Sequence, residues 1–267
     1  MIQGLKKLND LQGKRVLVRV DFNLPIKESL VADGSDWRIR TAIPTLEYLS
    51  KSGAKIIIIS HLGRPAGKDL SFSLYPIFLK LKDLWRSEGL FFAPDVFGPE
   101  TENQINKLKD GQAVLLENLR FYKEEEKNSD DFAKRISEYG DTFVNDAFAV
   151  SHRAHASITG IPKFLESYAG FLMEKEIAML SAVRDKPRRP LILIMGGAKA
   201  ETKLKLVKSF LDKSDAIILG GVLANILFSA KNMSIGKSVV EEDLIESAKK
   251  LKMTLNNLYL PVDVLTS

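Results

Sequence analysis

Short runs of consecutive apolar, often β-branched residues recur in the first part of the chain, and they constrain its fold more than any other feature. Amphipathic stretches with helical spacing separate these runs, such as Ile43, Leu46 and Leu49 ahead of Gly53. Strands that are apolar on consecutive residues are typically buried on both faces, as in parallel sheets. The alternation therefore predicts an α/β fold with a mostly parallel sheet. The five runs are residues 15–22, 54–60, 90–95, 113–118 and 141–148.

The pattern changes near residue 170, where residues 171–185 form one continuous helical stretch. We predict two Rossmann-like three-layer domains with parallel sheets, residues 1–172 and 187–267, joined by a hinge helix over residues 173–186. Three strands are few for such a domain, so we expect the second one to be incomplete. Its strand patterns stand at 191–197, 215–221 and 257–264, and its helical patterns at about 201–212 and 223–231.

Composition excludes several classes of protein. The 267 residues contain no cysteine, which leaves no disulfide, no thiolate nucleophile and no cysteine zinc site. The longest apolar runs, such as residues 56–59, are far shorter than the ~20 residues of a membrane helix, and the first residues lack the apolar stretch of a signal peptide. We therefore expect a cytoplasmic protein with no membrane partner.

The net charge of +5 is too small and too dispersed to indicate a polyanion partner. Residues 1–186 carry 27 Lys+Arg and 26 Asp+Glu, a net of +1, and residues 187–267 carry 12 and 8, a net of +4. No stretch alternates basic and aromatic residues, and we interpret KEEEK at 123–127 as an ordinary solvated charge run. We expect no nucleic-acid partner.

Charged and polar residues follow the predicted strands, and parallel sheets bind ligands beyond the carboxyl ends of their strands. Arginine offers a permanent charge and a planar fork of donors that suits carboxylate and phosphate groups. Several arginines from different loops therefore predict a site for a small ligand with several negative charges. The candidates are Asp21, Asn23, His61, Gly63, Arg64, Arg120, His152, Arg153 and His155, with Arg38 near the same edge just before the first helix.

All three histidines fall in these loops. His61 shares a tight loop with Gly63 and Arg64, which makes it the best candidate for ligand contact. His152 and His155 are equally compatible with a structural role. Their spacing gives a pair without an evident third ligand, so we predict no metal site.

A second candidate site lies in MGGAKAETK, residues 195–203, between a predicted strand and a helix. Glycines let backbone amides approach a phosphate, and the helix N-terminus adds its dipole. Lys199 and Lys203 are four residues apart and would share a helix face if the helix begins early. Gly220 and Gly221 end the next strand. The stretch matches neither common phosphate-loop pattern, and two turns that need glycine for steric reasons remain an equal alternative.

Two anion sites on two domains suggest a reaction between two phosphorylated or acidic ligands. The chain has neither a cysteine nor a serine in a GxSxG elbow. Direct phosphoryl transfer needs positioning and positive charge rather than a covalent enzyme intermediate. The composition fits that requirement.

Six motifs in order carry a family resemblance: RVDFNLP, WRIRTAIPTL, SHLGRP, LLENLRF, VNDAFAVSHRAHAS and GGAKAETK. Together they resemble the phosphoglycerate kinase family from about residue 14 onward. The resemblance implies reversible phosphoryl transfer between ATP and the carboxylate of 3-phosphoglycerate, which yields ADP and 1,3-bisphosphoglycerate in glycolysis, with magnesium (Mg²⁺) on the nucleotide. It also implies a monomer whose first domain holds the glycerate, whose second holds the nucleotide, and which closes by a hinge.

The resemblance also assigns roles to residues. Arg38 and Lys199 would be catalytic and stabilise the phosphoryl group in flight, and no residue is assigned to a metal. The substrate-binding set is Asp21, Asn23, Arg38, His61, Leu62, Gly63, Arg64, Arg120 and Arg153. The nucleotide-binding set is Gly197, Ala198, Lys199, Lys203, Gly220 and Gly221.

The chain departs from the family pattern in its second domain. Val222 stands where the family commonly has glycine, Thr202 where many members have aspartate, and the later GPMGVFE-like and GGGDT-like segments are absent. We therefore expect a fragment that binds 3-phosphoglycerate and turns over weakly or not at all. The alternatives are a protein that only binds the phosphorylated acid, and an amino-acid kinase, although a zwitterionic substrate would not need so many arginines.

Overall fold

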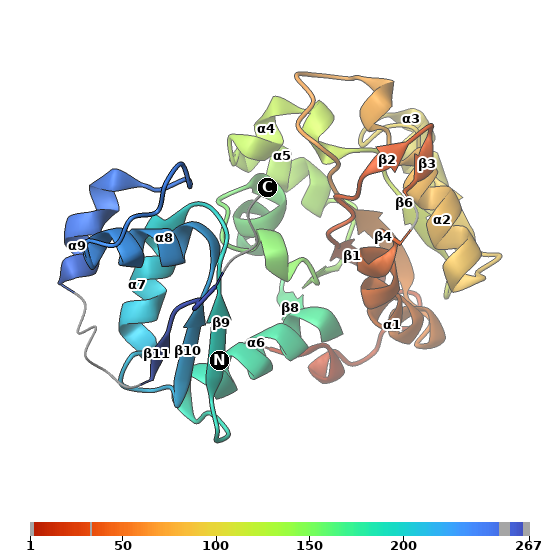
Figure 1. Ribbon diagram of the computed structural model, residues 1–267. Coiled ribbons are helices and arrows are strands. Elements are labelled where there is room, and N and C mark those ends of the chain that lie inside the picture. The colour runs from red at the N-terminus through yellow and green to blue at the C-terminus, as the bar shows by residue number, and fades with distance from the viewer. Residues whose placement is uncertain (1–2, 33, 251–256, 264–267) are drawn as a thin grey trace. The chain divides into compact units, whose positions relative to one another are not determined.

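The structure is a computed structural model that describes residues 3–32, 34–250 and 257–263. The chain divides into two compact units, Met1–Leu180 and Ser181–Ser267. The division falls inside helix α6 (Phe171–Asp185), whose residues the sequence pattern predicted as one helix (Figure 1).

The first unit contains a six-stranded parallel sheet with the strand order β5-β6-β4-β1-β7-β8. The five predicted strands are all present. The sixth, β8, was not predicted, because its three residues, Ser-Tyr-Ala, contain no apolar run. The strands are β1 (Arg15–Arg19), β4 (Lys55–Ile59), β5 (Leu90–Phe92), β6 (Ala113–Leu115), β7 (Thr142–Asn145) and β8 (Ser167–Ala169). A separate antiparallel hairpin joins β2 (Ile26–Lys27) to β3 (Leu30–Val31).

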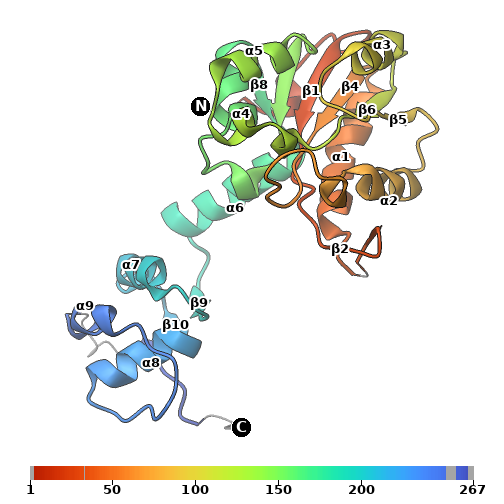
Figure 2. The same ribbon diagram turned by 90° about the horizontal axis from the view of Figure 1, so that it is seen from above.

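Helices cover both faces of this sheet, as Figure 2 shows. Alternate strand residues point to opposite faces: Val16 and Val18 pack with α1 (Trp37–Lys51) and α2 (Tyr75–Trp85). Leu17 packs instead with α3 (Pro99–Lys107) and α5 (Asp130–Ser137). The predicted three-layer α/β architecture is therefore confirmed for this unit, and burial on both faces explains why its strands are continuously apolar.

Short elements complete the carboxyl side of the sheet. They are α4 (Lys123–Glu126), a π-helical turn (Ala156–Gly160) and 3-10 turns at Leu70–Phe72, Leu119–Phe121, Phe148–Val150 and Ile161–Lys163. Another 3-10 turn, Leu5–Lys7, lies near the N-terminus.

The second unit has a parallel sheet in the order β11-β10-β9, with β9 (Ile192–Met195), β10 (Ala216–Leu219) and β11 (Leu258–Tyr259). The strand predicted at 257–264 ends at Tyr259, and Val264 lies outside the described residues. The helices are α7 (Ala200–Phe210), α8 (Gly221–Ala230) and α9 (Ile245–Lys249), after a 3-10 turn at Glu242–Leu244. The face opposite their core is exposed: Ile192, Ile194, Ile218 and Tyr259 are 41 to 78% accessible.

Packing of the π-helical turn on α5 makes Gly160 a sensitive position. A Cβ at Gly160 would stand 2.6 Å from the Cβ of Ala133. We predict that Gly160→Ala lowers the free energy of unfolding by ~1–3 kcal/mol, the usual cost of overpacking. Urea denaturation followed by circular dichroism measures the change. Gly67→Ala is the control, because nothing lies within 4 Å of its added Cβ. Equal midpoints for the two variants would contradict this packing.

Candidate active site

The loops after β1, β4, β6 and β7 leave one edge of the first sheet, because parallel strands share the edge at which they end. The structure thus gathers the substrate-side residues predicted from the sequence, from separate parts of the chain. They are Asp21 and Asn23 after β1, His61 to Arg64 after β4, Arg120 after β6 and Arg153 after β7.

Arg38 reaches this edge from helix α1. We predicted it just before the helix, but α1 begins one residue earlier, at Trp37. The Arg38 guanidinium forms an ion pair with Asp21, and its Cζ lies 4.8 Å from the centre of the Trp37 ring. Asp21 also accepts a hydrogen bond from the backbone N–H of Asn23 at 3.2 Å. A charge-assisted contact and an aromatic ring therefore hold the Arg38 side chain in place.

Side chains from neighbouring loops fix the shape of the loop 61–64. Asn118 accepts from the Leu62 N–H at 3.1 Å and donates to the Leu62 carbonyl at 2.8 Å. Asn23 accepts from the Gly63 N–H at 2.9 Å, and Gly63 has a φ of +60°, which glycine adopts without strain. The Arg120 guanidinium donates to the Gly63 carbonyl at 2.5 Å. Asn23 and Arg120 therefore lie at the edge of the sheet and also hold the loop 61–64 in place.

His61 is buried and neutral. Its Nδ1 lies 2.9 Å from Nη2 of Arg19, and an arginine can only donate, so Nδ1 accepts and the ring proton sits on Nε2. Burial, followed by the charges of Arg19, Arg120 and Arg153, holds the pKa of His61 far below its ordinary value of 6.5. Nε2 is buried without a hydrogen-bond partner among the described residues. His61 therefore carries a neutral N–H donor whose hydrogen-bonding capacity the described residues leave unused.

Two glutamates of the run 123–127 support this site. Our interpretation of the run as solvated was wrong for Glu125 alone, since the other four residues are exposed. Glu125 is fully buried and accepts from the backbone N–H and the hydroxyl of Ser157 at 2.9 and 2.5 Å. Glu126 pairs with Nη2 of Arg120 at 3.0 Å. A charge run shows residue type but not which of its members is buried, and the buried partner of Glu125, Ser157, is 32 positions away in the sequence.

Other basic side chains of these loops act electrostatically on Arg120 and on His61. Arg153, partly buried, and Arg64, exposed, are close enough to Arg120 to lower its pKa, although burial contributes most. His155 is partly buried, and burial lowers its pKa; its Nδ1 stands 4.0 Å from Glu125. His152 is exposed. Arg64, Arg120 and Arg153 therefore form a single positive region beside His61.

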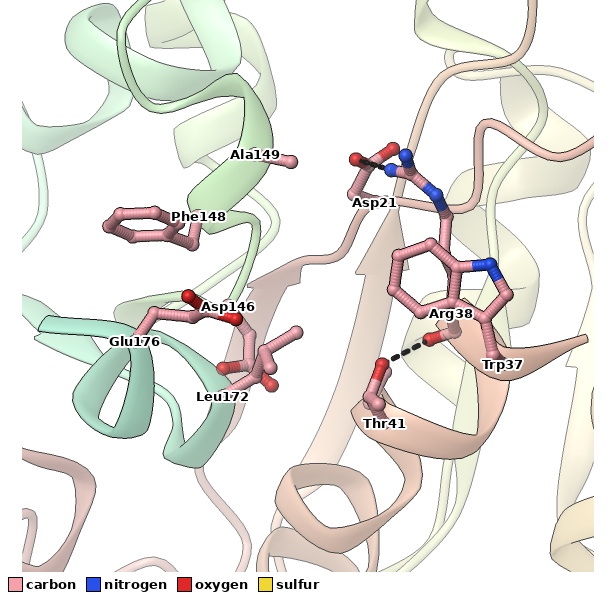
Figure 3. Close-up of a pocket in the computed structure, with 10 residues that line it drawn as sticks. Asp21, Trp37, Arg38, Thr41, Asp146, Phe148, Ala149, Leu172 and Glu176 are labelled. Carbon is pink, nitrogen blue, oxygen red and sulfur yellow. Dashed lines mark hydrogen bonds and ion pairs between the residues drawn. The ribbon is translucent and has the colours of Figure 1, made fainter. Parts of the chain in front are cut away.

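A small cavity of about 80 Å³ opens between α1, the end of β1 and α6, with Arg38 and Asp21 on one side and Phe148 on the other (Figure 3). Asp146 lines it and accepts from the Met173 N–H at 3.0 Å, while its Oδ2 is buried with no partner within the described part of the chain. Burial raises the pKa of Asp146. The cavity has room for a few water molecules next to Arg38.

The second unit brings two glycine turns into contact. Gly197, after β9, has a φ of +88°, and a Cβ on Gly221, after β10, would lie 3.0 Å from the Gly197 nitrogen. Lys203 donates to the Gly196 and Ala198 carbonyls, at 2.7 Å each. Because α7 begins at Ala200, Lys199 precedes the helix in a left-handed conformation and does not share a helix face with Lys203.

Other features bound the second site. Glu241 accepts from the Ala200 N–H at 2.8 Å, at the start of α7. Val222, which stands where the family commonly has glycine, is partly buried and packs against the core of its unit.

Among the described residues, no three His, Asp or Glu side chains gather as a metal site would require. No helix in the described ranges is both long and apolar enough to cross a membrane.

A parallel sheet edge that gathers arginines near a buried imidazole defines the class: an α/β protein whose basic residues collect beyond the carboxyl ends of its strands, where parallel sheets place their ligand sites. The sequence model of one family, phosphoglycerate kinase, matches residues 5–267. The chain therefore belongs to the phosphoglycerate kinase family.

Individual relatives agree with this assignment. Phosphoglycerate kinase of Coprothermobacter proteolyticus is 51% identical over 91% of this chain and 61% of its own length. That of Borrelia garinii subsp. bavariensis is 47% identical over 98% and 67%. The crystal structure of phosphoglycerate kinase from Pyrococcus horikoshii OT3 matches with a TM-score of 0.84 at 32% identity, over 98% of this chain and 67% of that one. The chain thus spans about three fifths to two thirds of the length of these relatives.

The buried state of His61 predicts a pH dependence of stability. The unfolded chain takes up a proton at this ring as pH falls through about 6.5, whereas the folded chain does not. The stability from neutral His61 is therefore complete above this pH and is lost below it. Between pH 7.5 and 5.5 we predict a loss of about 1.4 kcal/mol from this ring. Amide hydrogen exchange in β1 and β4 measures it. His61→Asn should flatten the slope by that amount; an unchanged slope would show that folded His61 titrates normally.

Proposed function

We propose that this protein transfers a phosphoryl group reversibly between ATP and the carboxylate of 3-phosphoglycerate, with ADP and 1,3-bisphosphoglycerate as the other pair. The family assignment supports the reaction. The observation that carries it is the positive region of Arg64, Arg120 and Arg153 beside the N–H of His61, which has no partner among the described residues, at the edge where parallel sheets bind ligands.

In this proposal the first unit binds the glycerate. The cations of the region meet its phosphate and carboxylate, and His61 donates its Nε2–H to an oxygen. The ion pair between Asp21 and Arg38 opens, so that Asp21 accepts from the substrate hydroxyl and Arg38 turns to the reacting carboxylate. The full substrate set is Asp21, Asn23, Arg38, His61, Leu62, Gly63, Arg64, Arg120 and Arg153.

The second unit would bind the nucleotide. The described residues fit phosphate groups, because Gly197 and Gly221 leave a backbone cradle that a Cβ would fill, with the Lys203 ammonium group 3.1 Å from the position of the Gly197 Cβ. Lys203 would exchange its two carbonyl partners for phosphate oxygens. Mg²⁺ keeps several waters and binds through substrate phosphates, so we propose that it arrives with the nucleotide. The full nucleotide set is Gly197, Ala198, Lys199, Lys203, Gly220 and Gly221.

The transition state would be stabilised by charge rather than by a covalent intermediate. Arg38 of the first unit and Lys199 of the second are the proposed partners of the equatorial oxygens of the moving phosphoryl group. Hinge closure would exclude water from the reaction. We further propose that the protein acts as a monomer in cytoplasmic glycolysis.

Isothermal titration with 3-phosphoglycerate tests the substrate site. We predict that the wild-type chain binds it, and that Arg153→Ala weakens binding about tenfold or more, the loss expected for a charged contact. Lys163→Ala is the control, because Lys163 is an exposed cation that pairs with Asp130. Equal weakening by both variants would reduce the site to general charge attraction, and no binding by wild type would refute it.

A coupled assay tests the catalytic role of Arg38. We predict that Arg38→Ala lowers kcat by roughly 10² to 10³, as loss of other transition-state donors does, and leaves ATP affinity unchanged. Arg40→Ala is the matched control, because Arg40 lies on the same helix but pairs with Asp36 in solvent. Unchanged kcat in Arg38→Ala would remove Arg38 from the mechanism. Binding of 3-phosphoglycerate without any wild-type turnover would favour the binding-only alternative.

A further inference from the structure

A chain of buried polar groups runs behind His61 and ends at Glu125. Glu125 Oε1 accepts from the Ser157 hydroxyl at 2.5 Å, and Ser157 Oγ accepts from Nε of Arg19 at 2.9 Å. Nη2 of Arg19 donates to Nδ1 of His61 at 2.9 Å. All four residues are at most 1% exposed. This series of hydrogen bonds joins α4, the π-helical turn, strand β1 and the loop after β4.

Each member of this chain limits what its neighbour can do. Arg19 has five donors and no acceptor, so it forces His61 to accept at Nδ1 and to carry its proton on Nε2. Burial opposes the Arg19 charge, and Glu125 is the largest favourable charge acting on it. Ser157 fixes the guanidinium by accepting at Nε, so that Nη2 points at the imidazole. The orientation of His61 thus depends on a carboxylate that it does not touch.

The far end of the chain is prepared for a ligand. A buried N–H without a partner is costly, and such groups in native structures call for a specific explanation. His61 Nε2 is this kind of group, and the positive region of Arg64, Arg120 and Arg153 lies beside it. An anionic oxygen would satisfy the N–H.

We propose that Glu125 is a positioning residue that, through Ser157 and Arg19, holds His61 as the tautomer whose Nε2–H is offered to the bound anion. The ligand identity rests on the proposed function, namely 3-phosphoglycerate; the tautomer does not. Glu125 touches no reacting group. The next residue of the same short helix, Glu126, forms an ion pair with Arg120 at 3.0 Å.

The test combines nitrogen NMR with titration on the full chain. Ser157→Ala removes only the hydroxyl that links Glu125 to Arg19, and Glu125→Gln removes the charge while keeping the shape. Ser137→Ala is the control, because Ser137 is also a buried serine and, within the described residues, its hydroxyl bonds only the Lys134 carbonyl at 2.6 Å. The readouts are the ring-nitrogen shifts of His61 and the Kd for 3-phosphoglycerate, with thermal melting to confirm folding.

We expect wild type and Ser137→Ala to show one Nε2–H tautomer at pH 7. In Ser157→Ala and Glu125→Gln the two ring nitrogens should move toward averaged shifts, and the Kd should rise about fivefold or more. A merely structural role would lower the melting temperature and leave both readouts at wild-type values, which would overturn the proposal. If wild type binds no 3-phosphoglycerate, the proposed function fails and the ring-nitrogen shifts alone decide the role of Glu125.

Discussion

The burial of the Arg19 charge is the constraint on which the candidate site depends. Arg19 ends the strand β1, near the middle of a parallel sheet, and its side chain is 1% exposed. A permanent charge in that position costs several kcal/mol unless each of its donors is paired. The pairing recruits Val20, His61 and Ser157 directly and Glu125 at one remove. The hydrogen bonds that pair the Arg19 guanidinium therefore fix the side chains at this edge of the sheet, including His61.

Sequence periodicity was sufficient for the architecture because the first sheet is buried on both sides. Five apolar runs became five strands, and the helical stretch 171–185 became α6 with the same bounds. The strand β8 was invisible to this reasoning, since its ladder with β7 is made by the backbone and its side chains carry no pattern. In the second unit the alternation of burial in β9, exposed at Ile192 and Ile194, differs from that of the first sheet.

For the candidate site, too, the sequence was sufficient for some residues and not for others. Residues at strand ends, such as Arg120 and His61, could be found from topology, because parallel strands end together. Their supports could not. Glu117 accepts from the N–H of Leu74 and so holds the start of α2, and Asn118 ties down the loop after β4. These contacts join residues more than 40 positions apart, and nothing in a local pattern distinguishes such a side chain from a solvated one.

The stacking of Trp37 on Arg38 has an optical consequence. The indole is 55% exposed and lies 4.8 Å from the Arg38 guanidinium, which pairs with Asp21. The only other tryptophan, Trp85, is buried at the end of α2. Movement of Arg38 would change the surroundings, and so the fluorescence, of Trp37 and leave those of Trp85 unchanged. The chain therefore carries a native fluorescent reporter next to Arg38, together with its own internal reference, Trp85.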